Sequence, residues 1–424
     1  MPLSWPFWSS KRNSLSLASG LVTASNIVVS PVLSPSSELA PEPAAPALKR
    51  ATGADLPIEI VEQIVAYLVR PELVVLLRTS RPLQRLVAPR VYRRIALEFF
   101  VPFHRIQTLF QGLAAHPEHA QHVHTFLIDI GSDIGADRGA TVQETVVSMF
   151  EAGFVNMTRL TVLSLPNKLN EAFAAVIGLT FPCLQRLEIK CDVPAVDFIA
   201  RHARTLTHLV YPHHLFDAHE LPEFPLLTHL HAAPAVLLHI LQVPGTCRQL
   251  VYLGIVCSPP LLPASHTRLE DDSVACIPTI MRLLHKHSAS PRAVSIREPR
   301  GLRNLSRALE EEDPLPSVTR LEIYSCADPE DDGLVRAENL VDALRVFPSV
   351  RMMRLASAFG FGKAMFGSMA PTNMVQGLHL RAPDLVVVVA DYDYFARQPG
   401  SAKFYLDRRR LEMPKAWDLV TSNY

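Results

Sequence analysis

The chain has 424 residues, of which 48% are apolar, and its 41 basic and 41 acidic residues give zero formal net charge. This composition is sufficient for a large buried core and excludes the strong charge excess that is typical of proteins binding nucleic acid or anionic membranes. The longest apolar run, residues 385–390, is far shorter than the roughly 20 residues of a membrane-spanning helix. We therefore expect a soluble protein with neither a nucleic-acid nor a membrane partner.

The first 50 residues differ in composition from the rest of the chain. They are rich in Ser, Pro and Ala, contain no acidic residue before Glu38 and show no helical or strand period, which predicts a disordered tail. A signal peptide or a mitochondrial presequence is the alternative, although a single Lys11-Arg12 pair favours the tail. The six cysteines form no CxxC pair, which predicts free thiols and a location in the cytoplasm or nucleus.

Residues 55–97 form the first segment with a clear helical period. Apolar residues recur every three or four positions over residues 60–68, and Asp55 is placed to cap this helix. Pro71 ends the first helix and begins a second one, and Ser80 begins a third. We expect a small bundle of three helices.

Two short sequences in this block, Leu-Pro-x-Glu-Ile at 56–60 and Pro-x-x-Tyr-Arg at 89–93, stand in register with each other. Together they resemble the F-box of fungal F-box proteins, although Val91-Tyr92 stands where many members have a Trp. The resemblance implies that the bundle docks on the Skp adaptor and, through it, on the cullin scaffold of a ubiquitin ligase. The adaptor-binding residues that it implies are Leu56, Pro57, Ile60, Ile64, Leu76, Leu77 and Leu83. The alternative is a bundle that only caps the domain that follows.

The template L-x-x-L-x-L, with any aliphatic residue allowed, recurs through residues 98–395. Its matches begin at Leu160, Leu184, Leu206, Leu227, Leu250, Val318, Val350 and Val375, with weaker matches at Val123 and Val294. Their successive separations from residue 160 are 24, 22, 21, 23, 68, 32 and 25 residues, and leucine-rich repeats have units of roughly 20 to 29 residues. The region resembles leucine-rich repeats in this period and template.

Segments with a helical pattern lie between these predicted strands, at 169–179, 194–204, 234–241, 273–287 and 336–347. Alternating strands and helices predict a parallel sheet with helices on its outer side. The expected fold class is therefore α/β, with the F-box-like bundle followed by an irregular leucine-rich-repeat solenoid over 98–395 and a C-terminal cap or tail over 396–424. A doubly wound α/β domain is the alternative, and the short period counts against it.

In such a solenoid the residues between the aliphatic positions face the concave side of the sheet, where we expect a target protein to bind. The candidate residues for this contact are His208, His229, His231, Tyr252, Arg297, Arg320, Arg354 and Arg381. Four arginines stacked in successive units would suit an acidic or phosphorylated segment. A solvated charged face without a partner is the alternative.

The central histidines also raise the question of a metal site. His208, His229 and His231 are predicted to lie on adjacent strands, but no carboxylate is placed to orient them and no HExxH or CxxC accompanies them. The chain also has no GxGxxG, GxxxxGK[ST] or GxSxG motif. We expect no catalytic residue, metal or cofactor, and a substrate-recognition subunit of an SCF-type ubiquitin ligase. A non-ligase binding scaffold and a hydrolase or metal enzyme using the histidines are the alternatives.

Overall fold

The computed structural model describes residues 56–97, most of 101–397, and 404–406, and its longest gaps are 129–139, 213–221, 258–267, 326–339 and 358–383. The chain divides into two units between Arg93 and Arg94. Among the described helices, none combines the length and the apolar character that crossing a membrane requires. The predicted tail at 1–50 and the predicted cap at Asp55 lie outside the described residues.

The first unit is the predicted three-helix bundle, formed by α1 (Ile58–Tyr67), α2 (Arg70–Leu76) and α3 (Arg81–Tyr92). Pro71 lies in the first turn of α2, as expected, and the Ser80 hydroxyl accepts a hydrogen bond from the Leu83 amide at the start of α3. The core of the bundle consists of Val65, Leu73, Val87 and Val91.

The predicted bundle boundary at residue 97 is wrong. Residues 94–97 form β1 (Arg94–Leu97), which pairs with β2 (Thr125–Ile128) as the first strand of the second unit. Ile95 and Leu97 are buried while Arg94 is exposed, so this segment has the period of a strand rather than of a helix. The helical period of α3 and the strand period of β1 are separated by Arg93 alone.

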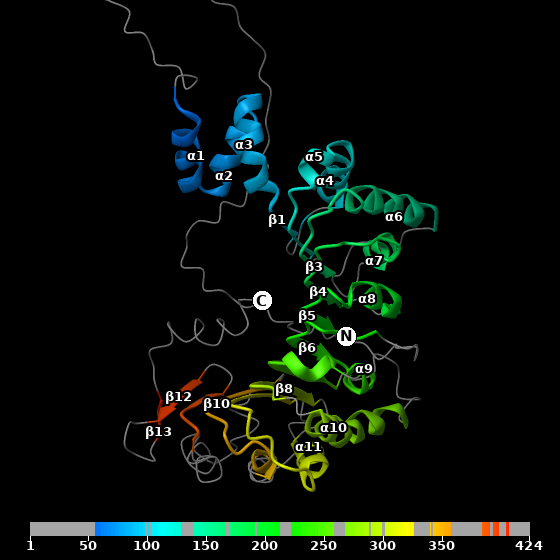
Figure 1. Ribbon diagram of the computed structural model, residues 1–424, viewed down its shortest axis with the longest axis vertical. Helices are drawn as coiled ribbons and strands as arrows, with labels where there is room; N and C mark the ends of the chain where they lie inside the picture. Colours follow the sequence, from blue (N-terminus) through cyan, green and yellow to red (C-terminus); the bar gives the residue numbers. More distant parts are fainter. Residues whose placement is uncertain are drawn as a thin grey trace, which may run out of the picture. The chain divides into compact units, whose positions relative to one another are not determined.

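The second unit contains a sheet whose described strands follow chain order from β1 to β13 (Figure 1). All pairs from β1 to β11 are parallel, as the repeat template predicted. After β1 and β2 come β3 (Val162–Leu165), β4 (Arg186–Ile189), β5 (His208–Tyr211), β6 (His229–Ala232), β7 (Tyr252–Val256), β8 (Ala293–Glu298), β9 (Arg320–Ser325), β10 (Met352–Ser357) and β11 (Val387–Ala390). The weaker template matches at Val123 and Val294 are thus confirmed as the sites of β2 and β8.

The C-terminal end of the sheet differs from the prediction. After β10 the next parallel strand is β11, and the template match beginning at Val375 lies outside the described residues. Two antiparallel strands then extend the sheet, β12 (Asp393–Arg397) and β13 (Phe404–Leu406). The sheet therefore continues past the predicted end of the solenoid at residue 395. Antiparallel strands need only short connections, so they can follow one another closely in the chain.

Helices return the chain between strands and lie on one side of the sheet in the second unit (Figure 1). The described ones are α4 (Phe103–Ala115), α5 (Pro117–Ala120), α6 (Ala140–Phe154), α7 (Asn170–Val176), α8 (Val196–His202), α9 (Pro234–Gln242), η2 (Thr246–Gln249), α10 (Arg268–Lys286), α11 (Leu302–Leu309) and η4 (Leu344–Val346). Helices α7 to α10 confirm four predicted return segments. In the fifth, 336–347, the described residues 340 and 342–346 are helical, the last three as η4, and residues 336–339 and 341 lie outside the described residues.

Buried aliphatic side chains fill the space between the sheet and these helices. The strand positions chosen by the template, such as Leu163, Leu187 and Leu209, have no exposed surface. Aromatic rings close the end near β2, where Phe110 makes edge contacts with Phe126 and Phe150 at centroid distances of 5.5 and 4.5 Å. Because the aliphatic positions are fully buried, the residues that alternate with them are directed to the opposite face of the sheet.

Candidate functional site

The face of the sheet opposite the helices carries the side chains that alternate with the buried aliphatic positions of β3 to β10, and we call it the open face. Within the second unit, the described helices lie on the other side of the sheet and do not cover it (Figure 1). Because the strands are parallel and in register, equivalent residues form rows across the sheet. The first row contains Arg186, His208, His229 and Tyr252 on four successive strands. Three of the eight predicted target-binding residues thus lie side by side.

The rings of this row are stacked. The imidazoles of His208 and His229 are nearly parallel, with an interplanar angle of 2° and a centroid distance of 4.2 Å. The ring of Tyr252 continues the stack at 6.0 Å from His229, with an interplanar angle of 26°. The centre of the open face is therefore a ledge of three flat rings, each half-buried, and we call it the ring ledge.

Two threonines set the tautomer of the stacked histidines. The Thr207 hydroxyl donates to the Gln185 carbonyl at 3.1 Å, and the Thr228 hydroxyl donates to the Thr207 carbonyl at 3.0 Å. Each hydroxyl oxygen also lies 2.8 Å from Nδ1 of the histidine that follows it. Since a hydroxyl has one proton, Nδ1 must be the donor in each pair, and Nε2 is then the acceptor nitrogen of the neutral ring.

Both stacked histidines are neutral at physiological pH. Burial lowers the pKa of His208 to about 4, with a further contribution from the Arg186 charge. Burial also lowers the pKa of His229 to about 3, and the neighbouring His208 and Arg186 charges act in the same direction. The neutral rings can stack closely because neither carries a charge that would repel the other.

His231 lies on the second row of the open face, in register with Val210 and Gly254. A Cβ atom added at Gly254 would lie 2.7 Å from Cγ of His231, so the imidazole occupies the space above the glycine. Its Nε2 is buried and has no hydrogen-bond partner in the described structure, and burial holds the pKa of His231 well below its ordinary value. Because Gly254 has no Cβ atom, it leaves the space that the His231 ring occupies, and we call this space the seat of His231.

Two carboxylates lie on the second row, that of Glu188 half-buried and that of Glu322 buried, and each contacts a serine and a cation. Glu188 accepts a hydrogen bond from Ser164 at 3.0 Å and pairs with Lys190 at 2.8 Å. Burial alone would raise the pKa of Glu188, but the Lys190 charge and the hydrogen bonds together hold it below its ordinary value. These contacts let a negative charge remain in a poorly solvated position.

The second such group of a serine, a glutamate and a cation lies on β8 to β10. Glu322 accepts from Ser295 at 3.1 Å and pairs with Arg354 at 3.4 Å, and the three residues are in register on adjacent strands. The alternation of residues along the predicted strands placed these serines and glutamates on this face, but none of them was among the predicted contact residues. Their signal was the position of each serine one repeat before the glutamate, at the same place in the template.

The predicted stack of arginines is wrong in its geometry. Arg320 lies on the first row and Arg354 on the second, whereas Arg297 is opposite Tyr324 on a third row. Arg381 lies outside the described residues. The three described arginines therefore share a face but lie on different rows, because each stands at a different position of the repeat template. One of them, Arg354, pairs with Glu322.

The geometry of the ring ledge does not support the alternative of a metal enzyme or hydrolase that uses these histidines. Within the part of the chain that the structure describes, His208, His229 and His231 do not bring three ligand atoms together. Nδ1 of both stacked rings is already bonded to a threonine. The group whose ligand atoms do converge is His116, Glu118 and His119, which the sequence prediction did not consider.

The predicted adaptor-binding residues of the first unit fall into two groups. Leu56, Ile60 and Ile64 are 48%, 41% and 46% exposed, and Pro57 is also exposed. Leu83 is half-buried. Leu76 and Leu77 are also half-buried and pack against the core of the bundle.

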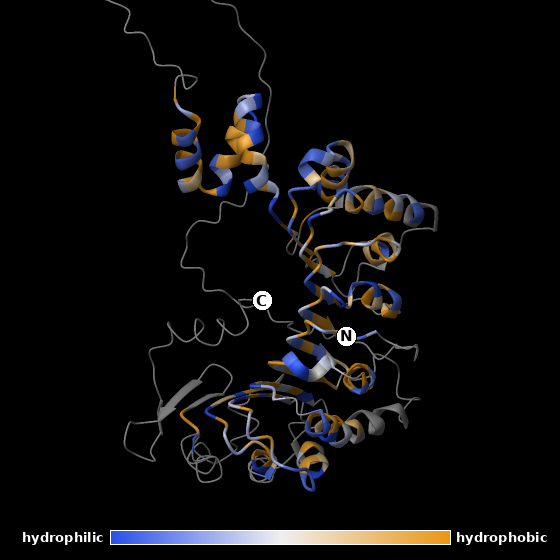
Figure 2. Cartoon of the chain, in the orientation of Figure 1, coloured by the Kyte–Doolittle hydropathy of each residue, from blue (hydrophilic) through white to orange (hydrophobic). Residues whose placement is uncertain are grey.

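Further exposed apolar side chains of the bundle were not predicted. They are Ile58, Tyr67, Val69 and Val75, with exposed fractions between 54% and 89%. Tyr67 follows Ile60 and Ile64 at seven- and three-residue spacing, so the helical period contained the signal. Figure 2 shows apolar residues along the whole of α1, interspersed with hydrophilic ones.

Comparison with models of protein families and with curated proteins found no match to this chain.

The depressed pKa values of the stacked histidines predict a pH-dependent stability. In the unfolded chain these groups titrate near 6.5, so below that pH the unfolded state binds more protons and the folded state loses stability as pH falls toward about 4. The variant His208→Gln/His229→Gln should lose less free energy of unfolding between pH 7 and pH 5, by about 1 to 2 kcal/mol after allowance for the half-exposed rings. Urea denaturation at both pH values measures this difference. The exposed His104→Gln should keep the parent's pH dependence, and an equal effect in both variants would contradict the assignment.

The seat of His231 predicts the effect of adding a methyl group at Gly254. Gly254→Ala should lower the free energy of unfolding by about 1 to 3 kcal/mol, because the ring must leave its position. The double variant His231→Ala/Gly254→Ala should show a favourable coupling that offsets much of this loss. Gly112→Ala is the control: a Cβ there meets nothing within 4 Å, so the change should be neutral or stabilising. Additive effects at 231 and 254 would show that the two positions do not share this space.

Proposed function

We propose that this chain is a substrate-recognition subunit of an SCF-type ubiquitin ligase, in which the helical bundle binds the Skp adaptor and the open face binds a target protein. In this proposal other subunits perform ubiquitin transfer. The observation that carries it is the second apolar face of α1. Val61 and Val65 of the helix pack in the bundle core, while Ile60 and Ile64 of the helix and Leu56 just before it remain exposed.

The exposure of several aliphatic side chains to water lowers the stability of so small a unit. A three-helix bundle has little core of its own, and contiguous exposed apolar surface generally marks a site where another protein binds. These residues also coincide with the positions that the F-box resemblance assigns to the adaptor. Two independent lines of argument, exposure and motif, thus support the same surface on α1.

The half-burial of Leu76 and Leu77 favours a different role for part of the motif. Both leucines pack against the bundle core, so their match to the F-box motif is compatible with a purely structural role. This observation supports the alternative proposal, a non-ligase scaffold in which the bundle is a cap. The two proposals differ in whether the exposed face of α1 has a partner of its own.

The charges of the open face indicate the kind of target. Its described positions on β3 to β10, together with Lys190 directly after β4, carry five basic side chains and two acidic ones: Arg186, Lys190, Arg297, Arg320 and Arg354, with Glu188 and Glu322. Five basic side chains against two acidic ones give these described positions a net positive charge. An acidic or phosphorylated segment that also places a flat side chain on the ring ledge would match this surface.

Adaptor binding is tested by two double variants of α1 that add the same charge. Ile60→Glu/Ile64→Glu should abolish co-purification with the Skp adaptor, because charged side chains would replace the exposed apolar contact. Gln63→Glu/Ala66→Glu changes exposed positions outside the implied surface and should retain the adaptor. Circular dichroism checks that both variants keep their helices. Failure of the parent chain to bind the adaptor would favour the scaffold proposal, and equal binding by both variants would rule out this face of α1.

Target binding is tested with a fluorescein-labelled oligoglutamate peptide in a polarisation assay on the full chain. The parent should bind it, with an affinity that falls as salt is raised. Arg297→Glu/Arg320→Glu should weaken binding at least about tenfold, equivalent to about 1.4 kcal/mol. Arg248→Glu/Arg345→Glu makes the same charge change at exposed positions outside the open face and should have little effect. Equal weakening by both variants would show that only net charge, and not the open face, attracts the peptide.

A further inference from the structure

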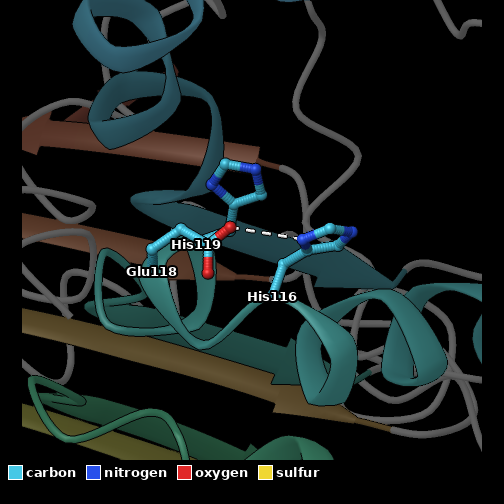
Figure 3. Close-up of side chains that lie close together, drawn as sticks. All are labelled: His116, Glu118 and His119. Carbon is cyan, nitrogen blue, oxygen red and sulfur yellow. Dashed lines mark hydrogen bonds and ion pairs between the residues drawn. The ribbon is translucent and has the colours of Figure 1, made fainter.

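Three side chains with metal-binding chemistry converge at the turn between α4 and β2. They are His116, Glu118 and His119, and one ligand atom from each lies within 4.8 Å of the other two. Nδ1 of His116 and Oε1 of Glu118 are 3.2 Å apart, and the two imidazole centroids are 5.5 Å apart. Figure 3 shows the Glu118 carboxylate beside both rings.

The backbone of this turn is well supported. The His116 amide donates to the Gly112 carbonyl at 2.9 Å, which joins the turn to the end of α4, and the His119 amide donates to the His116 carbonyl at 2.9 Å. Ala120 and Val123 are fully buried and anchor the segment in the core. The ligand-bearing residues are therefore held on a short, fixed piece of chain, which reduces the entropy cost of collecting them around an ion.

The exposure of the site is compatible with ion entry. His116 and Glu118 are exposed, and their side chains are 59% and 60% accessible, whereas His119 is half-buried. An ion can reach the group from solvent, and water can complete its coordination.

From this geometry we propose that His116, Glu118 and His119 form a binding site for a divalent transition-metal ion of the zinc class. Two imidazole nitrogens and one carboxylate oxygen are a donor set that zinc accepts, with metal–ligand distances of about 2.0 to 2.2 Å. Ligand atoms around such an ion are about 3.4 Å apart in a tetrahedron, so the His116–Glu118 pair already has the required separation. Small rotations of His119 complete the set.

The donor set also defines which ions are disfavoured. Magnesium and calcium prefer shells of oxygen ligands, and here nitrogen supplies two of the three protein donors. A cobalt(II) probe should give the visible absorption of nitrogen and oxygen ligation, without the near-ultraviolet band of a thiolate. The site needs no other part of the proposed function, since neither the ring ledge nor the helical bundle contributes to it.

Binding of the ion should stabilise the turn, because an ion that binds the folded state alone raises the free energy of unfolding by mass action. The direct test is calorimetric titration of the chelator-treated full chain with zinc chloride, together with thermal unfolding in its presence. We expect one saturable site above any weak background and a higher Tm with zinc. His116→Ala/His119→Ala should weaken zinc binding at least about tenfold and remove the shift in Tm.

The matched control is His104→Ala/His287→Ala, which removes two imidazoles outside the group and should leave the zinc affinity unchanged. Glu118→Gln keeps the size of the side chain but removes its charge, so it should weaken binding while preserving the fold even if the double alanine variant is unstable. Unchanged affinity in the Glu118→Gln and His116→Ala/His119→Ala variants would overturn the proposal. Equal loss in the control variant, or preference for magnesium over zinc, would also overturn it.

Discussion

The alternation of side chains along parallel strands in register is the constraint on which the second unit depends. Each strand must bury its aliphatic residues against the helices, and the residues between them are then forced onto the other face. Parallel register places equivalent residues opposite one another on strands about 4.8 Å apart. The stacking of His208 on His229, the seating of His231 over Gly254 and the pairing of Ser295 with Glu322 all follow from this arrangement.

The same constraint brings polar groups into a crowded and poorly solvated row, and the structure meets the cost in two ways. The stacked histidines remain neutral because burial lowers their pKa values, and their Nδ1–H groups donate hydrogen bonds to threonine hydroxyls. The glutamates remain beside a serine donor and a cation, which compensate their lost hydration. The middle of the open face is consequently flat and neutral, with basic residues around it, a combination that suits recognition of a partner by both shape and charge.

The helical bundle shows the opposite balance. Its core consists of few residues, and Ile60 and Ile64 of α1 and Leu56 just before it are exposed to solvent. In the sheet, the aliphatic residues that face the helices, such as Leu163, Leu187 and Leu209, are fully covered by the chain itself, whereas in the bundle an external protein would have to cover the exposed ones. This difference is the physical basis for assigning adaptor binding to the first unit and target binding to the second in the proposed function.

The sequence by itself determined the three-helix block, the parallel order of the repeats and the face on which His208, His229 and Tyr252 lie, because these follow from local period alone. It could not determine the end of the bundle, where one residue separates the helix from β1, or the rows of Arg297, Arg320 and Arg354, which depend on register across strands. Only the tertiary structure decided that Leu76 and Leu77 join the core and that His116, Glu118 and His119 converge. These properties depend on distances between side chains in space, which the spacing of residues along the chain does not specify.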